Sequence, residues 1–219
     1  MRRINLFSSL FLLLLSAGQG IAQDEKVHQY MRAITDQFKL DQAYKLEVDY
    51  IREDIMQETS VRGDALIWMK GLMYKMSVNE YIIYFDGQKQ YSQNTDIEEV
   101  YVSTPDPDKA SYLEAVPIRA IRSYQQNFRY QYMGLRPFQG KNLAEVQLYP
   151  LEPGGPYSML KLFVNPSTMK LAGFVLKHKE GIHYTMILNS VQHATGVTDD
   201  TFRFIQEEYP DTEVIELMD

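Results

Sequence analysis

The spacing of apolar residues changes early in the chain, from a helical period to a strand period. Between residues 24 and 38 apolar side chains recur every three or four positions, as Val27, Tyr30, Met31, Ile34 and Phe38. This spacing predicts an amphipathic helix with one apolar stripe. From Leu46 onward apolar residues alternate with charged ones, which is the pattern of strands that turn one face toward water. The chain is therefore expected to be mainly β after its first helix.

Turn signals divide the rest of the chain into short segments. Gly71 ends an apolar run, and Asp86-Gly87 is a strong hairpin signal. Clusters of Gly, Pro and Asn follow at residues 153–156 and 165–167. About ten or eleven antiparallel strands joined by short turns are therefore expected.

A second helical segment is expected midway along the chain, at residues 111–124. Leu113, Ile118 and Ile121 fall on one apolar side of it, and Pro117 kinks or restarts the helix. Two amphipathic helices are too few to cover both faces of a large sheet, but they can plug one concave face. The expected fold class is mainly β (α+β), a single curved antiparallel sheet forming an unclosed half-barrel. The N-terminal helix and the mid-chain helical insert would act as its lid.

Residues 1–22 carry the features of a signal peptide. Two arginines form a basic start, a short apolar stretch follows, and Gly20-Ile21-Ala22 supplies the small residues of a cleavage site. The apolar stretch is shorter than the roughly 20 residues that a membrane-spanning helix needs. We therefore expect cleavage after Ala22, and a single domain at residues 23–219 that is soluble and periplasmic. The chain has no cysteine that could carry a lipid anchor.

The composition argues against several classes of function. The chain carries 29 acidic and 22 basic residues, a net charge of −7. An acidic chain without a basic stripe argues against nucleic acid and against tight docking on anionic lipid headgroups. The sequence contains no Gly-x-Ser-x-Gly, P-loop, dinucleotide-binding or zinc-protease motif, and no cysteine. We therefore expect no enzymatic activity, no metal and no cofactor.

Two pairs of residues could be considered as metal ligands, but each fits a simpler explanation. His178 and His183 flank an expected hairpin turn with no carboxylate at zinc-like spacing, so we expect solvated loop or strand-edge histidines. Asp106 and Asp108 lack the glycine and the distal glutamate of a calcium loop, and the neighbouring prolines explain the pair as a turn.

Several segments, taken in order, resemble the LolA-type lipoprotein carriers. Lys70-Gly71-Leu72-Met73-Tyr74-Lys75-Met76 and Ile83-Tyr84-Phe85-Asp86-Gly87-Gln88 resemble a hairpin pattern of that family, and residues 98–107 look like the form found in Bacteroidetes relatives. Asp200-Thr201-Phe202-Arg203-Phe204, followed by residues 209–217, is similar to the family's closing pattern. The resemblance extends over nearly the whole chain after residue 28.

The resemblance implies an unclosed antiparallel barrel with lid helices. It also implies a periplasmic shuttle that takes acylated lipoproteins from an inner-membrane ABC-type release transporter towards the outer membrane and an acceptor there. Proteobacterial members carry Arg-Pro just after the strand's Trp-x-Lys, and that Arg helps to latch the lid. Here Trp68-Met69-Lys70 is followed by Gly71-Leu72. We therefore expect lid closure to rest on packing alone.

The concave face is expected to hold acyl chains, because each CH₂ left in water costs about 0.8 kcal/mol. The predicted trough residues are Leu46, Val48, Tyr50, Tyr74, Met76, Ile83, Leu160, Leu162, Phe174, Leu176, Met186 and Leu188. The predicted lid residues are Tyr30, Met31, Ile34, Phe38, Leu113, Ile118 and Ile121. The same pattern also suits a closed, dry core. Ile67 and Trp68 point to opposite faces, and the pattern leaves open which of them faces inward.

Two other functions fit the sequence less well. A periplasmic lipid- or lipoprotein-binding or sensor module could use the same scaffold, but sensors of this kind usually add a second domain or a membrane tether. A hydrolase acting on lipid or glycan would need a nucleophile and a base, and the sequence indicates no such pair. The carrier is expected to be a monomer without a stable membrane anchor, and to bind no nucleic acid.

Overall fold

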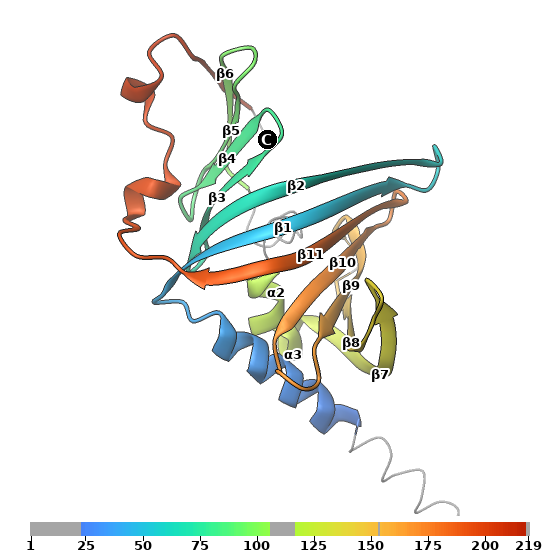
Figure 1. The fold of residues 1–219 in the computed structure, drawn as a ribbon. Helices are drawn as coiled ribbons and strands as arrows, with labels where there is room; N and C mark the ends of the chain where they lie inside the picture. The colour runs from blue at the N-terminus through green and yellow to red at the C-terminus, as the bar shows by residue number, and fades with distance from the viewer. Residues whose placement is uncertain (1–22, 106–116, 153, 218–219) are drawn as a thin grey trace, which may run out of the picture.

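One sheet of twelve strands, strongly curved and not closed into a barrel, dominates the computed structural model of the protein (Figure 1). The structure describes residues 23–105, 117–152 and 154–217. The predicted signal peptide, the predicted lid residue Leu113 and the Asp106/Asp108 pair lie outside the described residues. The mainly β, unclosed fold predicted from the periodicity is confirmed.

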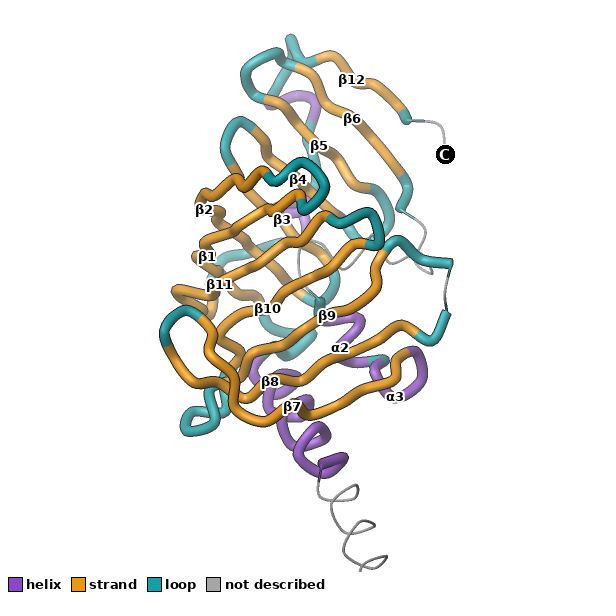
Figure 2. The backbone as a smooth tube through the Cα atoms, turned by 90° about the vertical axis from the view of Figure 1, so that its right-hand side faces the viewer, coloured by secondary structure: helices purple, strands orange, loops and turns teal. Residues whose placement is uncertain are grey.

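The strands stand in the order β12-β6-β5-β4-β3-β2-β1-β11-β10-β9-β8-β7, so β12 and β7 are the two edges of the sheet (Figure 2). Their bounds are β1 Ala43–Asp54, β2 Thr59–Lys70, β3 Met73–Val78, β4 Tyr81–Phe85, β5 Gln90–Asn94, β6 Glu99–Ser103, β7 Phe128–Phe138, β8 Lys141–Pro150, β9 Tyr157–Val164, β10 Leu171–His178, β11 Ile182–His193 and β12 Glu213–Glu216.

Two details of the strand prediction are wrong. The described residues form twelve strands instead of about ten or eleven, and β12 pairs with β6 in parallel, with Val214 opposite Val100. A parallel pair needs a long connection. Residues 194–212, which we call the strap, lead from β11 to β12 past the side of the sheet formed by β3–β6 (Figure 1). The strap contains two short 3₁₀ helices, η2 Asp199–Phe202 and η3 Gln206–Glu208.

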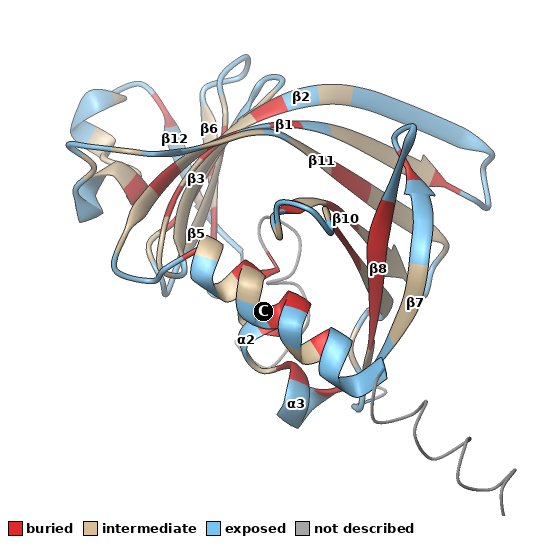
Figure 3. Cartoon of the chain, turned by 60° about the horizontal axis from the view of Figure 1, so that its bottom comes forward, coloured by how far each residue is buried: buried red, intermediate tan, exposed pale blue. Residues whose placement is uncertain are grey.

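Short helices lie across the open side of the half-barrel (Figure 3). The N-terminal helix spans residues 23–37, α2 spans Ile118–Arg122 and α3 spans Tyr124–Asn127. Pro117 occupies the N-cap position of α2, next to the first turn where backbone N–H groups have no intrahelical partner. The predicted helical insert is thus, in its described part, two short helices that meet at Ser123.

The predicted turns form where glycine or an Asx turn permits them. Gly71 lies between β2 and β3 with a φ of +61°, a conformation that costs glycine little. Asp86 opens the turn between β4 and β5, and its carboxylate accepts hydrogen bonds from the N–H groups of Gln88 and Lys89 at 2.9 and 2.8 Å. These turns fix the strand register and so decide which side chains share a face.

Buried side chains on the concave face form the main hydrophobic core. On β1, Tyr44, Leu46 and Val48 are buried. The register places Leu46 opposite Ile67 of β2 and Val191 of β11, so these residues share the concave face. The core continues through β8, β9 and β10 and is completed by the helices.

A second buried layer lies on the convex face of β4–β6. Tyr84, Val100 and Val102 are buried there, on the face opposite to the one that Ile83 shares with Met76. The strap covers this layer, because the ring of Phe204 lies 6.3 Å from that of Tyr84 between centroids. The convex face is therefore also buried in places: here beneath the strap, and on β7–β9 in a small cluster of Phe138, Leu143 and Phe163.

Candidate functional site

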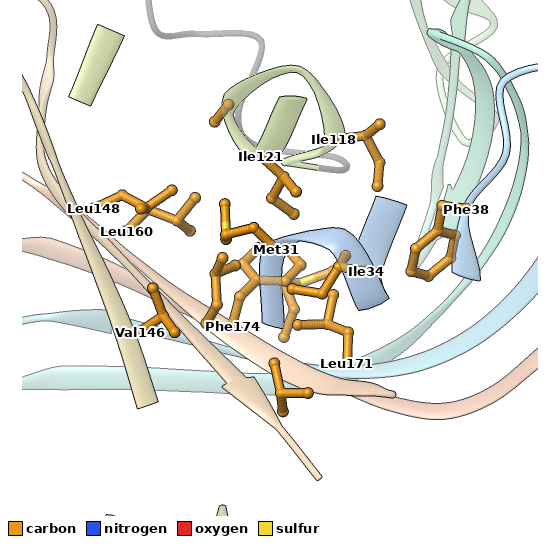
Figure 4. Packing of buried hydrophobic residues seen from close by; sticks show 14 of the residues in the cluster. Met31, Ile34, Phe38, Ile118, Ile121, Val146, Leu148, Leu160, Leu171 and Phe174 are labelled. Atoms are coloured by element: carbon orange, nitrogen blue, oxygen red, sulfur yellow. The ribbon is translucent and has the colours of Figure 1, made fainter. Parts of the chain in front are cut away.

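The N-terminal helix and α2 close the concave face with apolar side chains. Figure 4 shows Met31, Ile34 and Phe38 from the helix and Ile118 and Ile121 from α2 directed into one cluster with strand residues. All the described lid candidates are buried in that cluster: Tyr30, Met31, Ile34, Phe38, Ile118 and Ile121, together with Val27. The structure thus brings the two helical segments together over the sheet.

The predicted trough residues divide into two groups by burial. Seven are buried members of this concave cluster: Leu46, Val48, Leu160, Leu162, Phe174, Leu176 and Met186. Tyr50, Tyr74, Met76 and Leu188 are half-buried and pack against the cluster from its margin. Ile83 is also half-buried and lies opposite Met76 on β4, outside the cluster. The structure therefore assembles eleven of the twelve residues on one apolar surface.

The orientation that the sequence pattern left open is now clear. Ile67 is 1% exposed and belongs to the concave cluster, so its neighbour Trp68 lies on the convex face. There the Lys45 ammonium group lies 5.8 Å from the centroid of the Trp68 ring. A cation over an aromatic face is favourable, and it lets the large ring stay on the wet side of the sheet.

Hydrogen bonds supplement the packing of the helix. The Gln37 Oε1 atom accepts a hydrogen bond of 2.8 Å from the backbone N–H of Leu171 in β10. The Arg122 guanidinium of α2 donates one of 2.9 Å to the carbonyl of Phe38, where the helix ends. The expectation that closure rests on packing alone is therefore wrong.

A third hydrogen bond joins the two helical segments directly. His28 Nδ1 on the N-terminal helix bonds the hydroxyl of Tyr124 in α3. The Tyr124 ring also contacts that of Tyr130 on β7, with centroids 5.2 Å apart. Each of these polar contacts joins residues far apart in the chain, 84 to 134 positions, so no local motif could have indicated them.

Two tyrosines at the helix contacts have raised pKa values because they are partly buried. Burial raises the pKa of Tyr30, and its neighbour Tyr132 raises it further. Burial also raises the pKa of Tyr124, with Tyr130 adding to the effect. Removing water disfavours the phenolate form of both side chains. The seam between helices and sheet thus provides an apolar environment even where tyrosines line it.

Cavities beside this seam are small or polar. One of about 20 Å³ lies by the β2–β3 turn, among Met69, Leu72, Tyr74 and Ile118, and has room for about one water molecule. A larger one, of about 370 Å³, lies by the start of the N-terminal helix. Its lining is mostly polar and aromatic: Gln23, Asp24, Arg129, Tyr130, Gln131, Tyr132 and Tyr149.

The histidines are not arranged as metal ligands. His178 is half-buried at the end of β10 and lies against two aromatic rings, with centroids 4.3 Å from Tyr157 and 5.5 Å from Tyr184. His183 lies one strand away on β11, opposite Lys177. Burial and the Lys177 charge lower the pKa of His183. Within the described ranges, no group of three or more His, Asp or Glu side chains converges as a metal site would require.

Comparison with known proteins places this architecture among solved structures. No protein-family model and no curated protein matches the chain. An uncharacterized conserved protein from Thermus thermophilus superposes with a TM-score of 0.53 at 8% identity, covering 88% of this chain and 99% of that one. The likeness shows that the two chains share a fold.

Two further structural neighbours have functional descriptions. A LolA superfamily protein from Nitrosomonas europaea has a TM-score of 0.44 at 10% identity, covering 81% of this chain and 97% of that one. A Vibrio parahaemolyticus domain described as outer membrane lipoprotein-sorting has a TM-score of 0.41 at 10% identity, covering 81% and 95%. Separately, among the described residues no helix combines the length and apolar character needed to cross a membrane.

Proposed function

We propose that the protein is a periplasmic lipoprotein carrier of the LolA type, in the form found in Bacteroidetes. It would hold the acyl chains of lipoproteins against the concave face and shuttle them from the inner to the outer membrane. One observation carries the proposal. In the described part of the chain, a broad apolar sheet face is covered by helices that contact it mainly through apolar side chains, with hydrogen bonds such as that from the Leu171 N–H to Gln37.

Such a cover can be exchanged without breaking the sheet. Strand pairing runs unbroken beneath the helices from β1 to β11 and on to β8. When an acyl chain replaces a helix side chain, one apolar contact replaces another, so the exchange is nearly balanced in free energy and reversible. A carrier needs that balance, because it must bind its cargo and also release it.

The two groups of trough residues take different parts in this exchange. Leu160, Leu162 and Phe174 lie beneath the helices and would line the filled site. Tyr50, Tyr74 and Met76 are half-buried at the margin of the cluster and would contact an acyl chain first. The proposed partners are acylated lipoproteins, an ABC-type release transporter and an outer-membrane acceptor. The protein would act as a monomer, without catalysis, metal or cofactor.

A cross-link that fixes the helix to the sheet tests the proposal. The chain has no cysteine, so two introduced thiols can be joined without side reactions. Gln37→Cys and Lys170→Cys place one thiol at the end of the helix and one beside Leu171, which the Gln37 side chain contacts. A short bis-maleimide should then abolish binding of a fluorescent long-chain fatty acid, while the unlinked double variant binds it.

The matched control joins the β4–β5 turn to β12 instead. Lys89 and Glu216 form an ion pair of 3.8 Å across the β4–β5 turn and β12, far from the helix. The same cross-linker at Lys89→Cys and Glu216→Cys should leave binding unchanged. Undiminished binding in the helix-linked protein would contradict the proposal. Native mass spectrometry of protein from the periplasm adds a second readout: a co-purified acylated protein supports the carrier, and a free lipid would favour a lipid-binding or sensor module.

A further inference from the structure

Charge is divided unevenly between the two halves of the sheet. Residues 115–198, which include α2, α3 and β7–β11, hold nine lysine and arginine residues and three acidic ones. The rest of the chain from residue 23 holds 11 basic and 26 acidic residues. Residues 115–144 contain no acidic residue at all. The acidic net charge of the whole chain therefore conceals a basic region, and the expectation that the chain lacks a basic stripe is wrong.

The basic region ends at the free edge of the sheet. Arg129 and Arg136 on β7 are exposed, and exposed Lys141 follows them where the hairpin to β8 begins. Two large apolar side chains accompany these charges: Leu135 is 53% exposed and Leu151 is 58% exposed. The Leu151 N–H donates a hydrogen bond to the carbonyl of Asn127, which places Leu151 beside the start of β7. We call these five residues the β7 rim.

Few carboxylates oppose these positive charges. Glu145 on β8 is buried, bonded by Gln147 and paired with Lys161 at 3.6 Å. Asp24 shares the 370 Å³ cavity with Arg129, and Glu152 is exposed in the loop after Leu151. The β7 rim thus combines a net positive charge with exposed leucines.

The larger cavity lies along this same edge. It is lined by four consecutive residues of β7, from Arg129 to Tyr132. Consecutive side chains of a strand point to opposite faces, so a cavity that all four line must run along the strand edge. Tyr149 also lines it, and the Arg129 guanidinium lies 5.1 Å from the centroid of that ring. Tyrosine and arginine together are typical of membrane interfaces, where one end of a side chain is apolar and the other is wet.

We propose that the β7 rim docks on a bilayer surface rich in anionic lipids. The arginines and lysine would contact headgroups, and Leu135 and Leu151 would make shallow apolar contacts. The inference rests on the proposed function, because such docking brings the open side of the half-barrel to the acyl chains that it must load. An acidic protein surface would satisfy the charges, but the exposed leucines favour a bilayer.

Repulsion from the acidic half does not prevent this docking. Twelve strands spaced about 4.8 Å apart put β12 on the order of 50 Å from β7 along the sheet. The Debye length at physiological salt is about 8 Å, so charges at the β12 edge are screened from a surface that β7 contacts.

Vesicle binding tests the inference. We expect the protein to co-sediment with phosphatidylethanolamine/phosphatidylglycerol vesicles at physiological salt and to dissociate from them at high salt. It should not co-sediment with vesicles of phosphatidylcholine alone. Each basic side chain near an anionic surface strengthens binding about fivefold. The triple variant Arg129→Gln, Arg136→Gln and Lys141→Gln should therefore bind these vesicles about 100-fold more weakly. Leu135→Ser should weaken binding severalfold.

Matched variants on the acidic half serve as controls. Arg62→Gln, Lys89→Gln and Arg203→Gln remove the same charge from exposed positions on β2, the β4–β5 turn and the strap, and Ile97→Ser removes an apolar side chain that is 55% exposed. Equal losses in rim and control variants, or no preference of the wild type for anionic vesicles, would overturn the inference. Fatty-acid binding without vesicles is measured alongside. If it persists while vesicle binding is absent, docking fails and the carrier proposal stands.

Discussion

The two halves of the sheet differ in how their covers are attached. The strap over β4–β6 is continuous with β11 at one end and β12 at the other, so both of its ends belong to the sheet. Among the described residues, the N-terminal helix is continuous with the sheet through the few residues between its end and β1. The rest of its attachment is side-chain packing and hydrogen bonds. The strap is therefore fixed to the sheet at both of its ends, whereas we propose that the N-terminal helix can be exchanged for an acyl chain.

Charge follows the same division. The strap and β12 carry seven acidic residues within 199–217 and one basic residue, while the half beneath the helices is basic. We propose that one half stabilises the fold, and that the other half carries both the exchangeable surface and the rim that meets the membrane. Each prediction below tests this difference at one position.

Phe202→Ala should produce the largest loss of stability. Phe202 lies in the strap with none of its surface exposed, and Phe→Ala in a core costs about 3–5 kcal/mol of unfolding free energy. Because the strap is structural, the fatty-acid affinity of the folded protein should not change. Urea unfolding and probe titration measure the two quantities. A change in affinity would mean that the two covers are coupled and that the proposed division is wrong.

Ile34→Ala removes an equally buried side chain from the other cover. Ile34 is fully buried between the helix and the sheet, and the substitution should cost about 2–4 kcal/mol by urea unfolding. In the proposed exchange, however, the helix competes with the ligand for the concave face. Weaker docking of the helix should therefore raise fatty-acid affinity on the order of 10-fold. A stability loss with unchanged affinity would show that the helix is core and not a lid.

The sequence pattern predicted the strands well because most of them bury one face only. It could not predict which face, since Val100 and Val102 alternate with Glu99, Tyr101 and Ser103 much as Leu46 and Val48 alternate with charged residues, yet they lie on the convex side. Register and curvature decide that, and both depend on pairings between distant segments. Ile67 and Trp68 were ambiguous for a related reason, because both are apolar.

The polar contacts of the helix were missed for a different reason. Gln and Arg residues are usually exposed, so nothing in the sequence distinguishes Gln37 and Arg122. The fold brings them to Leu171 and Phe38. The basic rim could have been recognised earlier. Residues 115–144 contain no Asp or Glu, which can be read from the sequence alone. The net charge and composition of the whole chain do not reveal such a local segment.

Arg122→Gln should have a smaller effect that is specific to the lid. The substitution removes the hydrogen bond to the Phe38 carbonyl. A hydrogen bond to a charged group contributes about 1.5–3 kcal/mol to stability. The contribution should be smaller here, because the Arg122 side chain is exposed. We expect a severalfold faster uptake of the fatty-acid probe by stopped-flow fluorescence. Arg203→Gln, which removes an exposed ion pair with Asp200 in the strap, should not alter the rate. Similar acceleration in both variants would argue against a latch.

His183→Gln should have the smallest effect, and one confined to acidic pH. Burial lowers the pKa of His183, as do the charges of Lys177, Lys161 and His178, while Glu53 raises it. The unfolded chain therefore binds this proton more tightly than the folded protein does. Stability should decline as the pH falls through the ordinary histidine pKa of about 6.5, and the decline should end below the lowered folded-state pKa.

The His183→Gln variant should not show the loss of stability that protonation of His183 causes. Its urea midpoint should therefore be higher than that of the wild type at about pH 5 and equal to it at about pH 8. Lys177→Gln should weaken the same decline, because it removes the strongest positive neighbour that lowers the pKa. Burial is the largest cause of the lowered pKa, so the positive potential of the basic half is reported by the rise in the His183 pKa that Lys177→Gln produces. If NMR titration finds the His183 pKa at or above the ordinary value, the lysines do not dominate there, and the electrostatic contrast between the two halves of the sheet is weaker than the charge count suggests.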